Sequence, residues 1–426
     1  MDGVVRPVGL AQADGTYIMA PYSPIKDNIK KFFGTGTLFQ NGISISGGDA
    51  ETGYVTLSAN RQATEFVVDG DRLNRDTFLF RAGKKFDKWT VDGNVTYNTE
   101  KTETTSSNLF TELLQTATNI PIERFENSGQ SGHWTSYYNN PYWLRDNVRN
   151  TNRSNYVSMI GTLNYELNKN INFNYVANLR LSDASGLSYT NGYVDNLQVG
   201  GGNHTVVSSF DSANGNSRSF YHDFLVNFDY MLTDKVSFKA NIGNNIQDRL
   251  STFTSVGGDN LTVPGLYNIS NITGDPRRSN STVRTRRFSF FANVDLGYDD
   301  YLFLNLTGRQ DWSSTLATPT RTDTVGFFYP SASVSFVPSD LWKMPSMISF
   351  AKLRASVSQV GSGGTTPYRT AYNYVLAADG IYPDSAMTNP SVLPNPNLKP
   401  LITTTFEVGA ELKLFKNRLN FDFAAY

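Results

Sequence analysis

The chain has 426 residues, with Lys+Arg 37 against Asp+Glu 38, a formal net charge of -1 and no cysteine. The absence of cysteine excludes disulfides, iron–sulfur clusters and thiolate metal sites. The nearly neutral charge gives no basis for a nucleic-acid binder that depends on a basic surface. Hydrophobic residues make up 39% of the chain and aromatic residues 13%, a composition that predicts a folded protein.

The hydropathy excludes membrane-spanning helices. Its mean is -0.37, and no stretch approaches the ~18 apolar residues that such a helix needs. A transmembrane strand barrel is compatible with this value, because alternating polar and apolar residues average to a modest hydropathy. From length alone, two or three domains are expected of a complete soluble chain.

The first residues, 1–7, lack the basic, apolar and cleavage-site regions of a signal peptide. They fit either the start of a cytoplasmic protein or a point inside a longer chain, and the rest of the sequence has to decide.

Alternation with a period of two residues predicts β-hairpins along the whole chain. The clearest run is 171–182, where odd positions are apolar and even positions are mostly Asn, Arg or Ser. A tight turn at 168–170 joins it to the run before it. In chain order, strands are expected around 43–46, 54–59, 78–82, 89–97, 157–167, 171–182, 220–232, 236–242, 288–298, 302–306, 332–337, 352–360, 406–414 and 419–423.

Strand length and loop length both favour a membrane barrel. Many of the roughly fourteen strands are about ten to twelve residues long, as tilted membrane strands require, whereas strands of soluble sandwiches usually have about five or six. Tight turns alternate with long polar connections, as in outer-membrane barrels. The sequence therefore predicts an all-β, transmembrane antiparallel β-barrel. Long connections are expected near 98–155, 182–218, 247–283, 311–328 and 361–403.

Aromatic residues recur at strand ends beside the short connections, which favours an interfacial girdle over a general strand preference of aromatic residues. One segment, 106–118, has its apolar residues at helical spacing, and we expect a short helix packed within the first long loop. The girdle candidates are Phe86, Trp89, Tyr165, Tyr230, Tyr298, Tyr301, Trp342 and Phe415.

No catalytic or metal chemistry is expected. The three histidines, His133, His204 and His222, have no metal-ligand spacing. The glycines at 200–202 and 361–364 lack the context of a phosphate-binding loop. We therefore expect no enzyme activity and no cofactor. Asp223, Asp229 and Asp295 alternate with apolar residues and are expected to line the lumen.

The first long loop contains an unusual concentration of aromatic residues between 133 and 145. Rings mixed with amide and guanidinium groups suit stacking on sugars or gripping a peptide, and they equally suit a small core inside a long loop. Both interpretations stay open. The candidate ligand-binding residues are Trp134, Tyr137, Tyr138, Tyr142, Trp143 and Arg145.

Short motifs are distributed over nearly the whole chain. They are YSPIKDN at 22–28, FFGTG at 32–36, SISGG at 44–48, NNPYW at 139–143, YLFLN at 301–305, GRQDWSS at 308–314, FYPSASVSF at 328–336, KLRAS at 352–356, QVG at 359–361, PNPNLKP at 394–400 and FEVG at 406–409. Together, and in this order, they resemble the SusC/RagA family of TonB-dependent outer-membrane transporters.

The resemblance implies a function and a set of partners. The family imports glycans or peptides across the outer membrane, with energy from TonB acting on a plug and with a SusD-like surface lipoprotein closing the outer mouth. Its barrels resemble 22-stranded barrels with a plugged lumen. Here the signal peptide, the TonB box and the plug are missing and about fourteen strands are visible. We therefore expect residues 1–426 to be a partial barrel domain from inside a longer transporter, surrounded by outer-membrane lipid.

Two other classes are retained as alternatives. One is a passive porin-like or structural outer-membrane barrel, which has no plug. The other is a secreted all-β glycan-binding protein or glycosidase, the latter requiring paired carboxylates. For the barrel fragment, an open curved sheet or an imperfectly closed barrel is expected, because missing strands leave two edges.

Overall fold

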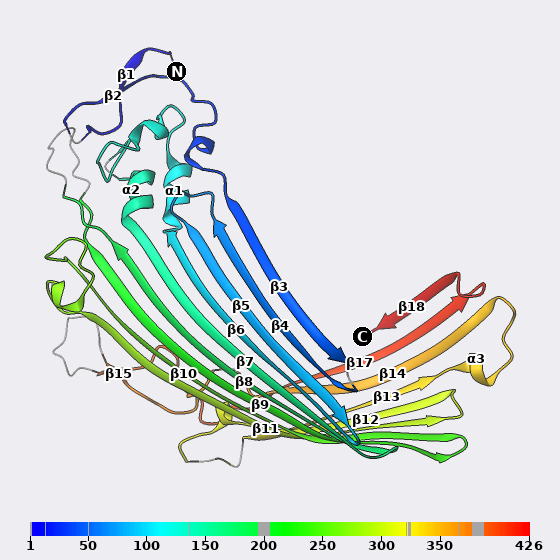
Figure 1. Ribbon diagram of the computed structural model, residues 1–426. Coiled ribbons are helices and arrows are strands. Elements are labelled where there is room, and N and C mark those ends of the chain that lie inside the picture. The colour runs from blue at the N-terminus through cyan, green and yellow to red at the C-terminus, as the bar shows by residue number, and fades with distance from the viewer. Residues whose placement is uncertain are drawn as a thin grey trace.

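The structure is a computed structural model that describes residues 2–12, 14–49, 51–135, 137–194, 205–320, 322, 325–364, 366–376 and 387–426. Most of it is one antiparallel sheet of fourteen strands (Figure 1). The strands of this sheet are β3 (Thr37–Asp49), β4 (Gly53–Glu65), β5 (Arg72–Phe86), β6 (Trp89–Thr105), β7 (Val148–Asn168), β8 (Ile171–Thr190), β9 (Ser209–Thr233), β10 (Val236–Asp259), β11 (Arg277–Tyr298), β12 (Leu302–Ser313), β13 (Gly326–Phe336), β14 (Ile348–Ser362), β17 (Leu401–Leu414) and β18 (Leu419–Ala425).

Smaller elements occupy the connections. Two further hairpins pair β1 (Val5–Val8) with β2 (Ile18–Pro21) and β15 (Val375–Leu376) with β16 (Met387–Thr388). The α-helices are α1 (Asn108–Gln115), α2 (Pro141–Asn147) and α3 (Pro338–Leu341), and the 3-10 helices are η1 (Lys30–Phe32), η2 (Ile122–Phe125), η3 (Ile269–Asn271) and η4 (Ser314–Leu316).

The predicted strands are all present in the sheet. Each pairs with its neighbour along the chain, and β14 pairs with β17 across the β15–β16 segment. β3 and β18 lie at the two edges, and no pairing joins them among the described residues. The sheet is therefore open and strongly curved, as the sequence predicted (Figure 1).

The alternation in the sequence becomes two faces of different chemistry. Register partners across a sheet share a face. One row across β3–β9 is apolar: Ile45, Leu57, Phe80, Val95, Met159, Leu179 and Phe220. The neighbouring row on the other face is mostly polar: Ser44, Ser58, Leu79, Thr96, Ser158, Arg180 and Ser219.

The apolar row lies on the outward face of a barrel wall and the polar row on the inward face. Large apolar side chains such as Leu57 (53% exposed) and Phe80 (45% exposed) have no protein cover on the outward face. A sheet that left such a band in water would aggregate, so the band requires lipid.

Among the described residues, no helix has both the length and the apolar character needed to cross a membrane.

The expected strand limits were too short. β9 has 25 residues and β10 has 24, where ten to twelve were expected. Because β10 and β11 stay paired as far as Gly257 and Arg277, the expected long connections at 182–218 and 247–283 shrink to 191–208 and 260–276. Away from lipid the outward face no longer needs apolar residues, so alternation ends while the backbone ladder continues.

The short connections form one end of the sheet and place the aromatic residues that the sequence singled out. Asp299 and Asp300 both have positive φ (49° and 57°), the backbone of a two-residue hairpin turn. Next to such turns, the Trp89 and Tyr165 ring centroids are 4.4 Å apart and those of Tyr298 and Tyr301 are 5.5 Å apart. The predicted helix within 106–118 is α1, shorter than expected by a few residues.

Candidate ligand-contact sites

Residues 2–35 and 106–147, apart from 13 and 136, form a small folded unit at the long-connection end of β3–β8, which we call the rim subdomain (Figure 1). It contains β1, β2, η1, α1, η2 and α2, and its core consists of two apolar clusters. The first cluster has Phe32, Leu109, Leu113, Ile122, Tyr142 and Leu144 at its centre, joined by Val68 from the connection between β4 and β5, and the second has Val8, Ile18, Ala20, Ile120 and Phe125.

Local sequence explains how the rim subdomain folds. Leu109 and Leu113 are one helical turn apart on α1 and are 0% and 1% exposed. α2 begins with Pro141 at its first position, and the Asn140 side chain accepts the backbone N–H of Tyr142 at 3.1 Å. A capping Asn followed by Pro is a strong helix start.

Three of the six predicted ligand residues, Trp134, Tyr137 and Tyr138, lie close together in the sequence of the rim subdomain. The Trp134 and Tyr138 rings stack at 5.4 Å with 9° between their planes, and Trp134 packs against the second cluster. Tyr137 is 87% exposed and makes no ring contact in the described part of the chain. The stacked pair offers a flat aromatic surface and Tyr137 an exposed phenol, and either group suits a sugar ring or a peptide side chain.

The other three support the rim subdomain from inside. Tyr142 is 4% exposed and its ring lies 4.8 Å from that of Phe32, so burial raises the pKa of Tyr142 to about 12. The Arg145 guanidinium lies 5.1 Å from the centre of the Tyr142 ring and pairs with Asp146 at 2.7 Å and Glu126 at 3.2 Å. These carboxylates raise the pKa of Arg145. Trp143 is half-buried against the first cluster. The six residues therefore do not converge on one surface.

A buried ion pair anchors the rim subdomain to the barrel wall. The Arg149 guanidinium at the start of β7 donates to Asp71 Oδ1 at 2.7 Å, to the Arg145 carbonyl at 3.0 Å and to the Gly70 carbonyl at 2.6 Å. The Thr105 N–H donates to the same Asp71 oxygen at 2.8 Å. Burial raises the pKa of Asp71, although the Thr105 N–H and the Arg149 charge oppose that effect.

The inward face carries a polar cluster that sequence reasoning did not single out. Arg309 donates to Asp311 Oδ1 at 2.7 Å and to Ser289 Oγ at 2.8 Å, and the Tyr329 hydroxyl donates to Asp311 Oδ2 at 3.0 Å. Asp311 is 2% exposed and Ser289 is 0% exposed. The GRQDWSS motif contained the signal, because Arg309 and Asp311 occupy alternate positions whose neighbours face lipid.

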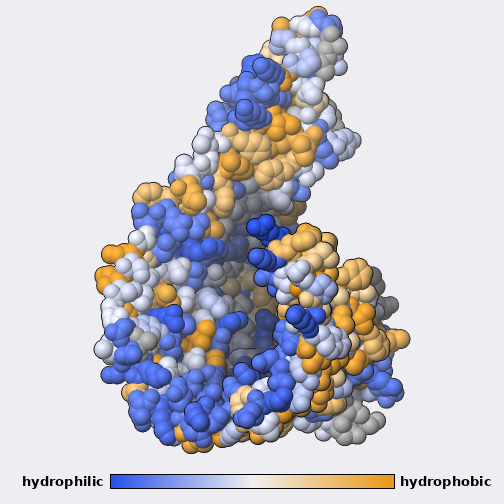
Figure 2. Space-filling view, turned by 90° about the vertical axis from the view of Figure 1, so that its right-hand side faces the viewer, coloured by the Kyte–Doolittle hydropathy of each residue, from blue (hydrophilic) through white to orange (hydrophobic). Residues whose placement is uncertain are grey.

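Beside this cluster is an arginine-lined recess with a volume of about 250 Å³, whose lining includes Gln247, Arg249, Arg287, Ser313 and Thr315. Arg287 donates to Gln247 Oε1 at 3.3 Å. The curved sheet surrounds a hollow, and hydrophilic residues form much of its wall (Figure 2). A recess with several guanidinium groups suits carboxylate or phosphate groups on a ligand.

Two of the three histidines lie in the part of the chain that the structure describes. In that part, no group of three or more His, Asp and Glu side chains could hold a metal ion. His133 is buried in the rim subdomain with its Nε2 at 3.0 Å from Thr116 Oγ1. His222 lies on the outward face with its ring centroid 5.5 Å from that of Tyr175 and 5.9 Å from that of Phe220. His204 and the glycines at 200–202 lie outside the described residues.

Comparisons with known proteins agree with this geometry. A family model described as "TonB dependent receptor-like, beta-barrel" matches residues 113–426. The structure of the RagAB peptide transporter matches with a TM-score of 0.74 and 14% identity, over 99% of this chain and 46% of that chain. The siderophore receptor PiuA from Acinetobacter baumannii matches with a TM-score of 0.50 and 13% identity, over 99% of this chain and 60% of that chain. The chain thus spans about half the length of the solved structures it matches. The search of curated proteins gives no match.

Proposed function

Because this chain belongs to the TonB dependent receptor-like β-barrel family, whose members are located in the outer membrane, we propose that it is the central barrel portion of a SusC/RagA-like importer. In this proposal residues 1–426 supply wall, lumen lining and outer loops, while a plug in the rest of the transporter couples to the TonB complex. A SusD-like surface lipoprotein closes the outer mouth, and the cargo is a peptide or an oligosaccharide.

The observation that carries the proposal is the combination of faces on the sheet. The outward face carries an uncovered apolar band, and the inward face carries the Arg309–Asp311 cluster and the arginine-lined recess. An inward polar wall at membrane depth is useful when a polar ligand has to pass. The fold similarity to a RagAB transporter over 99% of this chain supports the SusC/RagA assignment within the family.

The arginines give the cargo a chemical preference. Arg249 and Arg287 line the recess without a carboxylate partner among the described residues, and Asp311 in the neighbouring cluster is already paired with Arg309. Guanidinium groups without acidic partners attract carboxylates. Peptides with acidic side chains or a free C-terminus, and oligosaccharides with uronic acids, both meet this requirement.

The test is uptake by the full-length transporter in its own host. A deletion strain is complemented with the wild-type protein, with Arg287→Gln, or with Tyr137→Ala, and accumulation of labelled acidic peptides and oligosaccharides is measured with and without active TonB. We expect uptake that requires TonB and that Arg287→Gln reduces. Uptake that continues without TonB would support the passive porin instead. If the protein is absent from the outer-membrane fraction, that result would favour the secreted alternative.

A further inference from the structure

A belt of polar side chains replaces the apolar band on the outward face, towards the long connections. Tyr97, Val157 and Leu181 are register partners on β6, β7 and β8. The next outward-facing partners along the same strands are Thr99, Asn155 and Asp183. Long loops of outer-membrane barrels are extracellular, so the belt lies where the outer leaflet changes from hydrocarbon to headgroups.

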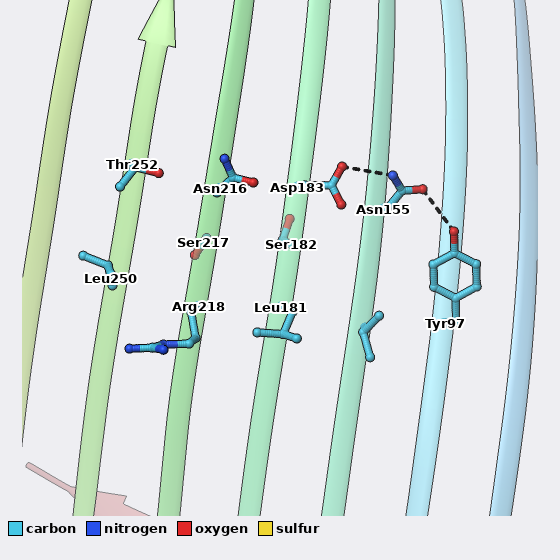
Figure 3. Close-up of a pocket in the computed structure, with 11 residues that line it drawn as sticks. Tyr97, Asn155, Leu181, Ser182, Asp183, Asn216, Ser217, Arg218, Leu250 and Thr252 are labelled. Carbon is cyan, nitrogen blue, oxygen red and sulfur yellow. Dashed lines mark hydrogen bonds between the residues drawn. The ribbon is translucent and has the colours of Figure 1, made fainter.

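A groove crosses this border on β6–β10, with a volume of about 490 Å³ (Figure 3). On its membrane side it is lined by Val157, Leu181 and Leu250, with Arg218 between the two leucines in the same row, and on its outer side by Asn155, Asp183, Asn216 and Thr252. The groove thus has an apolar row that contains a single guanidinium group, and a hydrogen-bonding row beyond it.

The polar end is organised by two hydrogen bonds. The Tyr97 hydroxyl donates to Asn155 Oδ1 at 3.2 Å, and Asn155 Nδ2 donates to Asp183 Oδ2 at 3.0 Å. The three side chains project from adjacent strands and point along one line (Figure 3). A row of hydroxyl, amide and carboxylate groups is the set of partners that sugar hydroxyls use.

The charge of the belt is positive on this part of the wall. Arg218 is exposed in the groove and has no ion-pair partner within the residues that the structure describes. On the adjoining strands, Arg284 and Arg286 share a single carboxylate, Asp248, at 2.6 Å and 2.9 Å. Together with Arg218 and Asp183, this part of the wall therefore has three guanidinium groups and two carboxylates. An unpaired guanidinium at a membrane surface attracts anionic headgroups.

We propose that this groove binds one molecule of a phosphorylated glycolipid of the outer leaflet. Its acyl chain lies along Val157, Leu181 and Leu250, its sugar hydroxyls bond to Asn155 and Asp183, and its phosphate pairs with Arg218. A phospholipid offers the acyl chain and the phosphate but lacks the ring of hydroxyls. The occupant is therefore distinguished from bulk phospholipid by its sugar and from a neutral glycolipid by its charge.

The experiment uses the full-length transporter purified in detergent, with lipid binding followed by native mass spectrometry. The probes are diphosphorylated lipid A, its dephosphorylated form, and phosphatidylglycerol. Wild type is compared with Arg218→Gln, Arg218→Lys, Asp183→Ala and Arg180→Gln. Arg180 is the matched control, because it loses the same charge from the inward face of the neighbouring strand β8. Heat-modifiable gel mobility checks that each variant is folded.

We expect Arg218→Gln to weaken binding of diphosphorylated lipid A by about tenfold, with Arg218→Lys restoring part of it. Binding of the dephosphorylated form should not depend on Arg218, whereas Asp183→Ala should weaken both forms. The proposal is overturned if Arg218→Gln and Arg180→Gln behave alike, or if phosphatidylglycerol binds as tightly as lipid A. It is also overturned if the groove holds a second copy of the transporter, seen as a dimer that Arg218→Gln dissociates.

Discussion

Replacing Arg149 by Leu should release the rim subdomain from the barrel wall. The change removes three hydrogen bonds, at 2.7 Å to Asp71, 3.0 Å to the Arg145 carbonyl and 2.6 Å to the Gly70 carbonyl. It also leaves the Asp71 carboxylate, 8% exposed, without its cation. Because burial already raises the pKa of Asp71 with Arg149 present, the isolated carboxylate is costlier still.

The expected magnitude follows from that geometry. Breaking a buried pair by removing one partner costs about 3–5 kcal/mol, and Asp71 keeps the Thr105 N–H at 2.8 Å, which places the cost near the lower limit. About 3 kcal/mol raises the open population of the rim subdomain roughly a hundredfold. Hydrogen exchange of peptides from 106–147 in the full-length transporter measures this opening directly.

Two variants make the test sharp. Lys31→Met removes an exposed ion pair of the same subdomain, with Glu123 at 3.6 Å, and should change exchange by less than about 1 kcal/mol. The double variant Asp71→Asn with Arg149→Leu removes the orphaned charge and should recover part of the loss. The reasoning is refuted if Arg149→Leu exchanges no faster than Lys31→Met, or if the double variant is as open as Arg149→Leu alone.

Three further predictions concern the rim subdomain and the short turns. Burial raises the pKa of Glu112 above its ordinary 4.5. The protonated carboxyl therefore contributes fully to the stability of the rim subdomain below pH 4.5, and this contribution is lost as the pH rises through the raised pKa. Glu112→Gln should make the stability less dependent on pH, as measured by hydrogen exchange from pH 4 to 8. Phe125→Ala, at a side chain 1% exposed, should cost the rim subdomain about 3–5 kcal/mol by exchange, whereas Leu114→Ala, at a side chain 74% exposed, should cost little. Asp300→Val places a β-branched residue at φ 57° and should destabilise the barrel by about 1–2 kcal/mol in urea unfolding in micelles, while Asp300→Gly should not; equal midpoints for the two would contradict this account of the turn.

The sequence predicted every strand of the sheet because lipid enforces alternation along the stretch that crosses it. It could not predict where the strands end. On β10 beyond Gln247, outward Asp248 and Thr252 flank Leu250 and alternate with inward Arg249 and Ser251, so the outward face is no longer uniformly apolar while the pairing with β11 continues. Backbone hydrogen bonds hold these extensions, and they are indifferent to side-chain type.

The sequence also could not predict which candidate site residues are buried, because burial depends on contacts between distant segments. The aromatic loop predicts Tyr142 as a ligand contact, but Tyr142 is buried against Phe32, which is far away in the sequence and meets it only after the chain folds. The Asp71–Arg149 pair is likewise a contact between distant segments. Among the residues that the structure describes, exposed Tyr137 has no such distant partner, so its exposure could be predicted from the loop that carries it.

The long strands extend the barrel wall above the membrane. At about 3.3 Å per residue and a tilt near 40°, the 21 residues of β7, which begins at the rim subdomain, rise roughly 50 Å, well beyond the ~30 Å of a hydrocarbon core. A hydrogen-bonded wall of that height holds the rim subdomain above the lipid surface. A ligand therefore meets the protein at a fixed height above the membrane, because the hydrogen-bonded wall keeps the barrel opening rigid.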